Sequence, residues 1–136
     1  MHSLRQRINT RDESGFTLIE LLVVLIIIGI LLAIAVPSYL GFRDKAQKTA
    51  AAANVREAIP SAEAYYSDQT PNTYAGMDET ALKTTYDSGL STTLKAFGDA
   101  DSYCISDNNG THFAKVVGPG GTVQSGLLAG CTDANG

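Results

Sequence analysis

One uninterrupted apolar segment dominates the pattern of hydrophobic and polar residues along this chain. It runs from Phe16 to Val36, 21 residues in which Glu20 is the only charged side chain. A helix of that length extends roughly 31 Å at about 1.5 Å per residue, close to the ~30 Å thickness of a bilayer's hydrocarbon core. The pattern therefore predicts an apolar helix long enough to span a membrane, with one carboxylate near its start.

The helical pattern is predicted to continue beyond Val36. The stretch Ser38–Tyr66 contains a single glycine, and Ala46–Ala58 is strongly helix-forming. One apolar face recurs at helical spacing and is predicted to cover a sheet. This face comprises Val55, Ile59, Ala62 and Tyr66.

Two prolines, Pro37 and Pro60, fall inside the predicted helix. A proline removes one backbone hydrogen bond and clashes with the carbonyl four residues earlier, so each predicts a kink. The charged residues of this half are predicted to face solvent or other copies of the chain, and a solvated face is the simpler interpretation. They are Arg43, Asp44, Lys45, Lys48, Arg56 and Glu57.

Beyond the helix, whose end is marked by Thr70–Asn72, the chain is predicted to form an antiparallel meander of three or four strands. Two β-prone stretches, Ser102–Ser106 and Thr111–Val117, flank Asp107–Gly110. An Asn-Gly pair in such a turn is a strong hairpin signal. The next turn and a third short strand are predicted at Gly118–Gly121 and Thr122–Ser125.

Two stretches before the hairpin have weaker patterns. Asp78–Lys83 predicts a short helical turn, whereas Leu90–Phe97 fits either a strand or a short helix. Residues 67–136 are about half the chain, and a core of that size is marginal alone. We therefore expect the sheet to pack on the helix, with its edge covered by the C-terminal tail or by a neighbouring copy.

Charge is distributed unevenly. Before Gly15 three arginines stand against Asp12 and Glu13, a net of +1, whereas from Phe16 onward 7 basic and 12 acidic residues give −5. A mildly acidic body argues against a general nucleic-acid-binding surface, which needs clustered lysines and arginines. The arginines before the apolar segment favour a cytoplasmic location for that end, although basic residues also follow the segment.

The two cysteines, Cys104 and Cys131, lie in the last third of the chain. In an exported protein such a pair indicates a disulfide, and in a reducing compartment two buried thiols. The disulfide would close a loop of about 27 residues, for which the chain-entropy relation gives roughly 3–4 kcal/mol.

Other candidate chemistry is weak. Four side chains with hard oxygen ligands, Asp99, Asp101, Asp107 and Asn108, suit calcium, but their spacing matches no EF-hand loop. Asn109-Gly110-Thr111 matches a glycosylation sequon, yet the same residues form the predicted hairpin turn. His2 and His112 have no obvious partners for a metal site, and no arrangement of Ser, His, Asp or Cys suggests catalysis. We expect no metal, cofactor or enzymatic activity.

The apolar segment allows three interpretations. A secretory signal peptide would be cleaved near Ala33-Ile34-Ala35, but the segment is longer than usual for one and contains Glu20. An ordinary membrane anchor explains the length but not the carboxylate, which costs about 2.5–3.5 kcal/mol in a bilayer. A segment that first spans a membrane and later packs between copies of the chain explains both.

The stretch Gly15-Phe16-Thr17-Leu18-Ile19-Glu20-Leu21-Leu22-Val23-Val24 resembles the cleavage and methylation motif of type IV pilins and the related pseudopilins. The likeness continues through Gly29 and Ile34-Ala35-Val36-Pro37. It covers residues 14–48 closely and the remainder only in layout.

The resemblance implies a role for each residue of the motif. Gly15 would end a leader that a prepilin peptidase removes, and Phe16 would become an N-methylated N-terminus. Glu20 would pair with the N-terminal amine of an adjacent subunit during assembly and fix its register. The disulfide between Cys104 and Cys131 would close a C-terminal loop of the kind that pilins commonly carry.

The family implies an α+β fold in which a long, kinked N-terminal helix packs on a small antiparallel sheet. The expected parts are a cleaved leader (1–15), a membrane or filament-core half of the helix (16–36), an amphipathic half (37–69) and a globular region (70–136). The subunit would wait in the cytoplasmic membrane, and an assembly ATPase and platform protein would extract it into a helical surface filament.

The resemblance leaves the role of that filament open. A pilus would serve adhesion, motility or surface attachment, a secretion pseudopilus would push cargo, and a competence pilus would take up DNA. From a different class, a small secreted protein with an ordinary signal peptide would begin at Val36 after processing instead of at Phe16.

Overall fold

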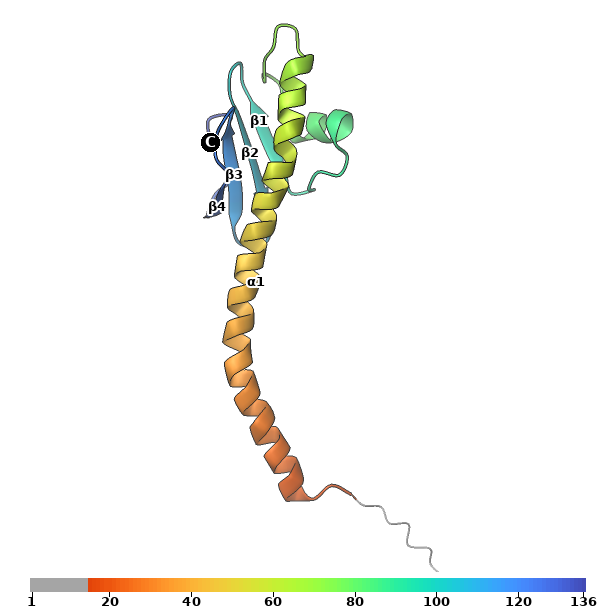
Figure 1. Cartoon of the computed structure of the whole chain (residues 1–136), viewed down its shortest axis with the longest axis vertical. Coiled ribbons are helices and arrows are strands. Elements are labelled where there is room, and N and C mark those ends of the chain that lie inside the picture. Colours follow the sequence, from red (N-terminus) through yellow and green to blue (C-terminus); the bar gives the residue numbers. More distant parts are fainter. Residues whose placement is uncertain (1–14) are drawn as a thin grey trace, which may run out of the picture. The chain divides into compact units, whose positions relative to one another are not determined.

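The computed structural model describes residues 15–136, so the predicted leader lies outside the described residues except for Gly15. The described chain contains one long helix, a short helical segment and four strands (Figure 1). The elements are α1 (Leu18–Asp68), α2 (Glu79–Ala81), the π-helical turn η1 (Leu82–Tyr86), β1 (Lys95–Gly98), β2 (Tyr103–Asn108), β3 (Phe113–Gly118) and β4 (Gln124–Leu127). The predicted α+β class is confirmed.

The chain divides into two compact units with a boundary between Tyr39 and Leu40. Pro37 and Pro60 both lie within α1, one in each unit. The helix therefore continues through both prolines, as the sequence predicted, and the two kinks stay predictions.

The four strands form one antiparallel sheet in the order β1-β2-β3-β4. The β2–β3 hairpin predicted from Asn-Gly is present, with Ile105 opposite Val116 and Gly110 at a φ of 93°. The undecided stretch 90–97 resolves into β1 at its end. Within β4, Gly126 has a φ of 77° where the register of β3 and β4 shifts, so this glycine supports a β-bulge.

The strand boundaries differ from the predicted ones by about two residues at the hairpin. Asp107 was expected in the turn, but it lies within β2. Its carboxylate is buried and accepts hydrogen bonds from three side chains, which stabilise this residue in a strand despite its turn propensity. The third strand is likewise displaced, from 122–125 to Gln124–Leu127.

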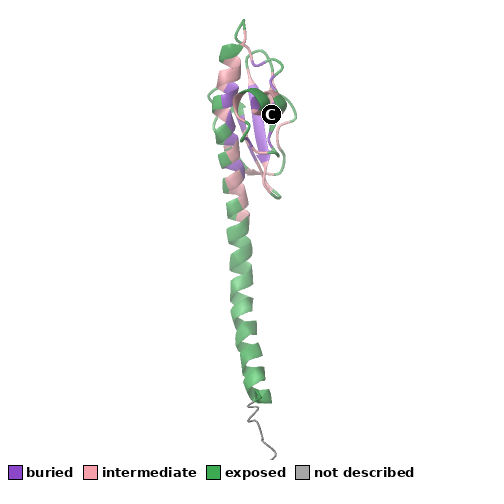
Figure 2. Ribbon diagram, turned by 90° about the vertical axis from the view of Figure 1, so that its right-hand side faces the viewer, coloured by how far each residue is buried: buried purple, intermediate pink, exposed green. Residues whose placement is uncertain are grey.

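The core of the second unit forms where α1 crosses one face of the sheet (Figure 2). Of the predicted helix face, Val55 and Ala62 are fully buried, and Ile59 and Tyr66 are partly buried against the core. Three further alanines, not predicted as core residues, are also buried on α1, and their small side chains suit close packing of a helix on a sheet. They are Ala51, Ala52 and Ala58.

Strand β2 is buried on both faces. Tyr103 and Ile105 belong to the core cluster with α1, whereas Cys104 and Ser106, which point the other way, contact the C-terminal tail. The C-terminal tail thus covers a face of the sheet, whereas the sequence predicted that it would cover an edge. At the β1 edge, an isolated bridge joins Asp78 to Phe97.

Candidate processing and assembly site

The start of α1 carries a side-chain cap. Thr17 precedes the helix, and its Oγ1 accepts a hydrogen bond from the backbone N–H of Glu20 at 3.2 Å. Its carbonyl accepts from the N–H of Leu21 at 3.1 Å, which is the first helical bond. Thr17-Leu18-Ile19-Glu20 has the Thr-x-x-Glu spacing of a capping box, so the local sequence specifies where the helix begins.

Glu20 occupies the third position of the helix, where the positive end of the helix dipole favours a carboxylate. It shares a shallow hollow with Phe16, Leu21 and Val24. The residue that would carry a new N-terminus after cleavage therefore lies on the same side of the helix start as the carboxylate.

Gly15 is not required by packing. A Cβ atom at this position would have no atom of the described residues within 4 Å, apart from its chain neighbours. The folded chain therefore tolerates a larger residue here, and any need for glycine must come from another step.

Apolar side chains cover the whole first part of α1. Every large apolar side chain from Phe16 to Val36 is at least 46% exposed in the single chain. An 18-residue window of the helix has a mean hydropathy of 3.2, and among residues 15–136 α1 is the one helix whose length and composition suit a membrane span. A surface of this kind needs lipid or other apolar helices around it.

In the second unit, Glu63 of α1 joins the helix to two buried tyrosines. Its Oε2 accepts from the hydroxyl of Tyr74 at 2.9 Å, and its Oε1 accepts from Tyr103 at 3.1 Å. Burial, and then the neighbouring Glu63 carboxylate, raise the pKa of Tyr74 to about 12 and raise that of Tyr103 as well. Both tyrosines therefore remain neutral donors across the physiological pH range.

Asp107 makes a second polar connection between α1 and the sheet. Its Oδ2 accepts from Asn54 of α1 at 2.8 Å, and its Oδ1 accepts from Ser91 at 2.7 Å and Thr93 at 2.8 Å. The carboxylate is 1% exposed. Three donors from two other segments thus replace the water that this charge loses on folding.

We expect Asp107→Ala to lower the free energy of unfolding by about 2 kcal/mol, because three donors lose an ionised acceptor. Ser91 and Asn54 are only partly buried and Thr93 is exposed, so water compensates in part. Asp107→Asn is the matched control and should cost about 1 kcal/mol, since it keeps one acceptor oxygen. Chemical denaturation of the purified chain measures both, and equal losses would show that the charge contributes nothing.

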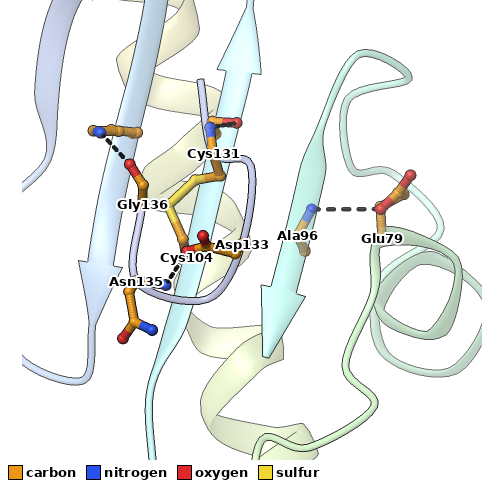
Figure 3. Close-up of a disulfide and its surroundings, with 9 residues drawn as sticks. Glu79, Ala96, Cys104, Cys131, Asp133, Asn135 and Gly136 are labelled. Atoms are coloured by element: carbon orange, nitrogen blue, oxygen red, sulfur yellow. Dashed lines mark hydrogen bonds between the residues drawn. A yellow bond between two sulfur atoms is a disulfide. The ribbon is translucent and has the colours of Figure 1, made fainter. Parts of the chain in front are cut away.

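The disulfide between Cys104 and Cys131 is present, with a Cα–Cα distance of 5.9 Å (Figure 3). The backbone N–H of Cys131 donates to Ser106 Oγ at 3.0 Å, and Lys115 Nζ donates to the carbonyl of Gly136 at 3.1 Å. The bond and these contacts hold the tail across β2 and β3.

The candidate calcium ligands do not come together. Asp99 and Asp101 lie in the turn before β2, where Asp99 Oδ1 accepts from the N–H groups of Asp101 and Ser102. Asp107 lies near the far end of β2. Among residues 15–136 no group of three or more His, Cys, Asp or Glu side chains is arranged to hold a metal ion.

Sequence reasoning missed three residues that the structure uses. The role of Thr17 could have been found from the Thr-x-x-Glu spacing. The roles of Glu63 and Asp107 had no local signal, because their partners lie up to 53 positions away in the sequence.

A family profile described as "Prokaryotic N-terminal methylation motif" matches residues 10–36. The type IV wide pilus major component of Thermus thermophilus is 36% identical over 97 residues, which cover 70% of this chain and 72% of that protein. The type IV narrow pilus major component of the same organism is 38% identical over 99 residues, covering 68% and 85%.

The chain is also similar to a protein of a secretion apparatus. The type II secretion system core protein G of Pseudomonas aeruginosa is 36% identical over 77 residues, covering 55% of this chain and 54% of that protein. No solved structure matches the chain significantly.

Proposed function

The chain belongs to the family of type IV pilins and related pseudopilins, and we propose that it is a pilin subunit that polymerises into a type IV pilus. The observation that carries this proposal is the first part of α1, an exposed apolar helix with a single carboxylate near its start. A bilayer covers this surface before assembly, and the equivalent helices of other subunits cover it in the filament. The role is structural, with no catalytic step and no cofactor.

A secretion pseudopilus is the second candidate, because a secretion-system protein is among the relatives. The pilus is better supported. The chain aligns with 72% and 85% of the two pilus components but with 54% of the secretion protein.

Before assembly we place the subunit in the cytoplasmic membrane, with residues after the apolar segment outside. A prepilin peptidase cuts after Gly15, Phe16 becomes the methylated N-terminus, and an assembly ATPase with a platform protein moves the subunit into an extracellular filament. The match to an N-terminal methylation motif over residues 10–36 and the position of Phe16 within it support this order of events.

Electron microscopy of fibres sheared from cells that express the chain tests the proposal. We expect thin fibres whose subunit begins at methylated Phe16 by mass spectrometry and contains the rest of the chain. A secreted monomer that begins at Val36 would overturn both the processing site and the filament.

We expect Gly15→Val to block processing without disturbing the fold. An added Cβ at this position meets no other described residue, so we expect the branched side chain to act in the site of the peptidase. The uncut precursor, heavier by the leader, should accumulate in the membrane fraction, and fibres should be absent. Gly29→Val is the matched control, since a Cβ there is also unhindered but lies away from the cleavage site; normal processing of Gly15→Val would contradict the assignment.

A further inference from the structure

The charges of the second unit are unevenly distributed along its sequence. From residue 40 to 59 there are four basic and two acidic residues, a net of +2, and from 60 to 136 three basic and nine acidic residues, a net of −6. Three exposed cations, Arg43, Lys45 and Arg56, form no ion pair within residues 15–136; Arg43 and Lys45 are the two at the start of the unit. We call these two residues the basic collar.

Nearby charges explain why the collar has no ion-pair partner among residues 15–136. Asp44 is the adjacent carboxylate, but it already contacts Lys48 at 2.7 Å and His112 at 2.7 Å. The hydrogen bond from Lys48, with its positive charge, lowers the pKa of Asp44 despite partial desolvation. This carboxylate is therefore occupied, and the collar remains free for another partner.

The other end of the unit presents exposed carboxylates. Thr73 Oγ1 donates to the carbonyl of Ala100 at 3.0 Å, which ties the turn between β1 and β2 to the loop that follows α1. That turn and the end of α1 carry three exposed acids, which we call the acidic end: Asp68, Asp99 and Asp101. Hydrogen bonds from Ser102 keep the pKa of Asp99 below its ordinary value, so it is ionised at neutral pH.

The collar and the acidic end cannot meet in one molecule. Lys45 and Asp68 belong to the same helix, 23 residues apart, which separates them by about 35 Å along the axis. They can meet between two copies that are shifted by about that distance. Because such a contact joins two different surfaces, it does not close on itself, and its repetition extends a filament.

We propose that the basic collar of one subunit contacts the acidic end of a second copy of this chain that is displaced by about 35 Å along the filament, a different neighbour from the one whose Phe16 amine faces Glu20. The inference rests on the proposed function. Complementary charge favours this partner over a general acidic surface, because both halves of the contact are present in every subunit. Membrane topology supports the proposal too. Cations directly after a membrane span oppose export of the end that carries them, so membrane insertion does not explain why Arg43 and Lys45 are present.

Charge reversal tests the contact in whole cells. We expect Arg43→Glu with Lys45→Glu to lower the yield of sheared fibres by about tenfold, because like charges then face each other. Membrane insertion and cleavage should be unchanged, since removing cations here favours the required orientation. Adding Asp68→Lys with Asp101→Lys should restore the yield. These two acids are chosen because their replacement disturbs little within the subunit. The Asp101 side chain makes no hydrogen bond among the described residues, and Asp68 accepts one exposed hydrogen bond, from Tyr86.

Arg56→Glu with Lys83→Glu is the matched control, because it changes the net charge equally while leaving the collar intact. Normal yield after collar reversal, or no restoration by the second pair, would overturn the inference. Loss of the subunit from the membrane without restoration would assign the collar to anionic lipid headgroups instead. If the unaltered chain makes no fibres, the proposed function is wrong. If the unaltered chain makes fibres but the charge-reversed variants do not change the fibre yield as expected, only the proposed contact is wrong.

Discussion

Cells that produce the Glu20→Gln variant are expected to contain normal amounts of processed subunit in the membrane and almost no filaments. Glutamine keeps the size and polarity of the side chain but carries no charge. The variant therefore retains the apolar segment needed for insertion and the Gly15–Phe16 bond needed for cleavage. What it loses is the anion that we propose pairs with the amine of Phe16 on a neighbouring subunit.

The size of the effect follows from the surroundings of that pair. Once apolar helices exclude water, an ammonium group left without its carboxylate costs about 3–5 kcal/mol. Since each 1.4 kcal/mol is a factor of ten, the affinity of a subunit for the filament end should fall by at least about a hundredfold. Sheared fibres counted by electron microscopy, with immunoblots of the membrane fraction, measure assembly and insertion separately.

Thr17→Val is the matched control for this experiment. It removes the hydroxyl that caps the N–H of Glu20 at 3.2 Å but leaves the carboxylate in place. Loss of a helix cap costs about 1 kcal/mol, so this variant should still assemble at reduced yield. Normal fibres from Glu20→Gln would show that assembly does not require the charge, and equal defects in both variants would assign the requirement to local helix capping instead.

The capped helix start also changes how the carboxylate is understood before assembly. The sequence showed Glu20 as a lone charge in an apolar segment. Its proposed partner, the amine of Phe16, exists only after cleavage. In the folded chain Glu20 sits at the positive end of a helix, three positions after the residue that caps it. This location lowers the free-energy cost of holding the anion in the membrane before assembly. On assembly, the full positive charge of the Phe16 amine is added to the partial positive charge of the helix end.

The sequence predicted the elements that depend on local patterns. The apolar segment and the alanine-rich stretch predicted α1, because helical propensity and period are local properties. Asn-Gly predicted the β2–β3 hairpin for the same reason. The sequence did not decide between strand and helix for residues 90–97. Only Lys95–Gly98 pair with β2, and the local pattern of hydrophobic residues does not reveal that pairing.

The parts that the sequence did not predict depend on contacts between distant residues. Asp107 looked like a turn residue because its donors, on α1 and on the loop before β1, are known only once the chain is folded. Ala51, Ala52 and Ala58 counted as helix formers rather than core residues, because small side chains carry little hydrophobic signal. The coverage of a sheet face by the tail likewise depends on where the disulfide places it.

Removal of the disulfide, by Cys104→Ala with Cys131→Ala, is expected to destabilise the second unit by about 3.5 kcal/mol. The bond closes a loop of 27 residues, and the chain-entropy relation gives that value for the freedom regained by the unfolded chain. The contacts that would remain on the tail are the packing of small residues such as Ala134 and single hydrogen bonds, several of them exposed, such as the one from Lys115 to Gly136. These are each too weak to replace the covalent bond.

For a unit of this size, each 1 kcal/mol shifts the melting temperature by about 4–8 °C, so a loss of roughly 14–28 °C is expected. Thermal unfolding of the purified chain in detergent, followed by circular dichroism, measures it. Because the buried Cys104→Ala change also removes a packed sulfur atom, the unaltered chain treated with a reducing agent is the control. Equal melting temperatures for the reduced and oxidised chains would show that the disulfide is not needed to hold the sheet on α1. An equal loss of melting temperature in the double variant and in the reduced chain would mean that the subunit must reach an oxidising compartment before it is stable enough to assemble.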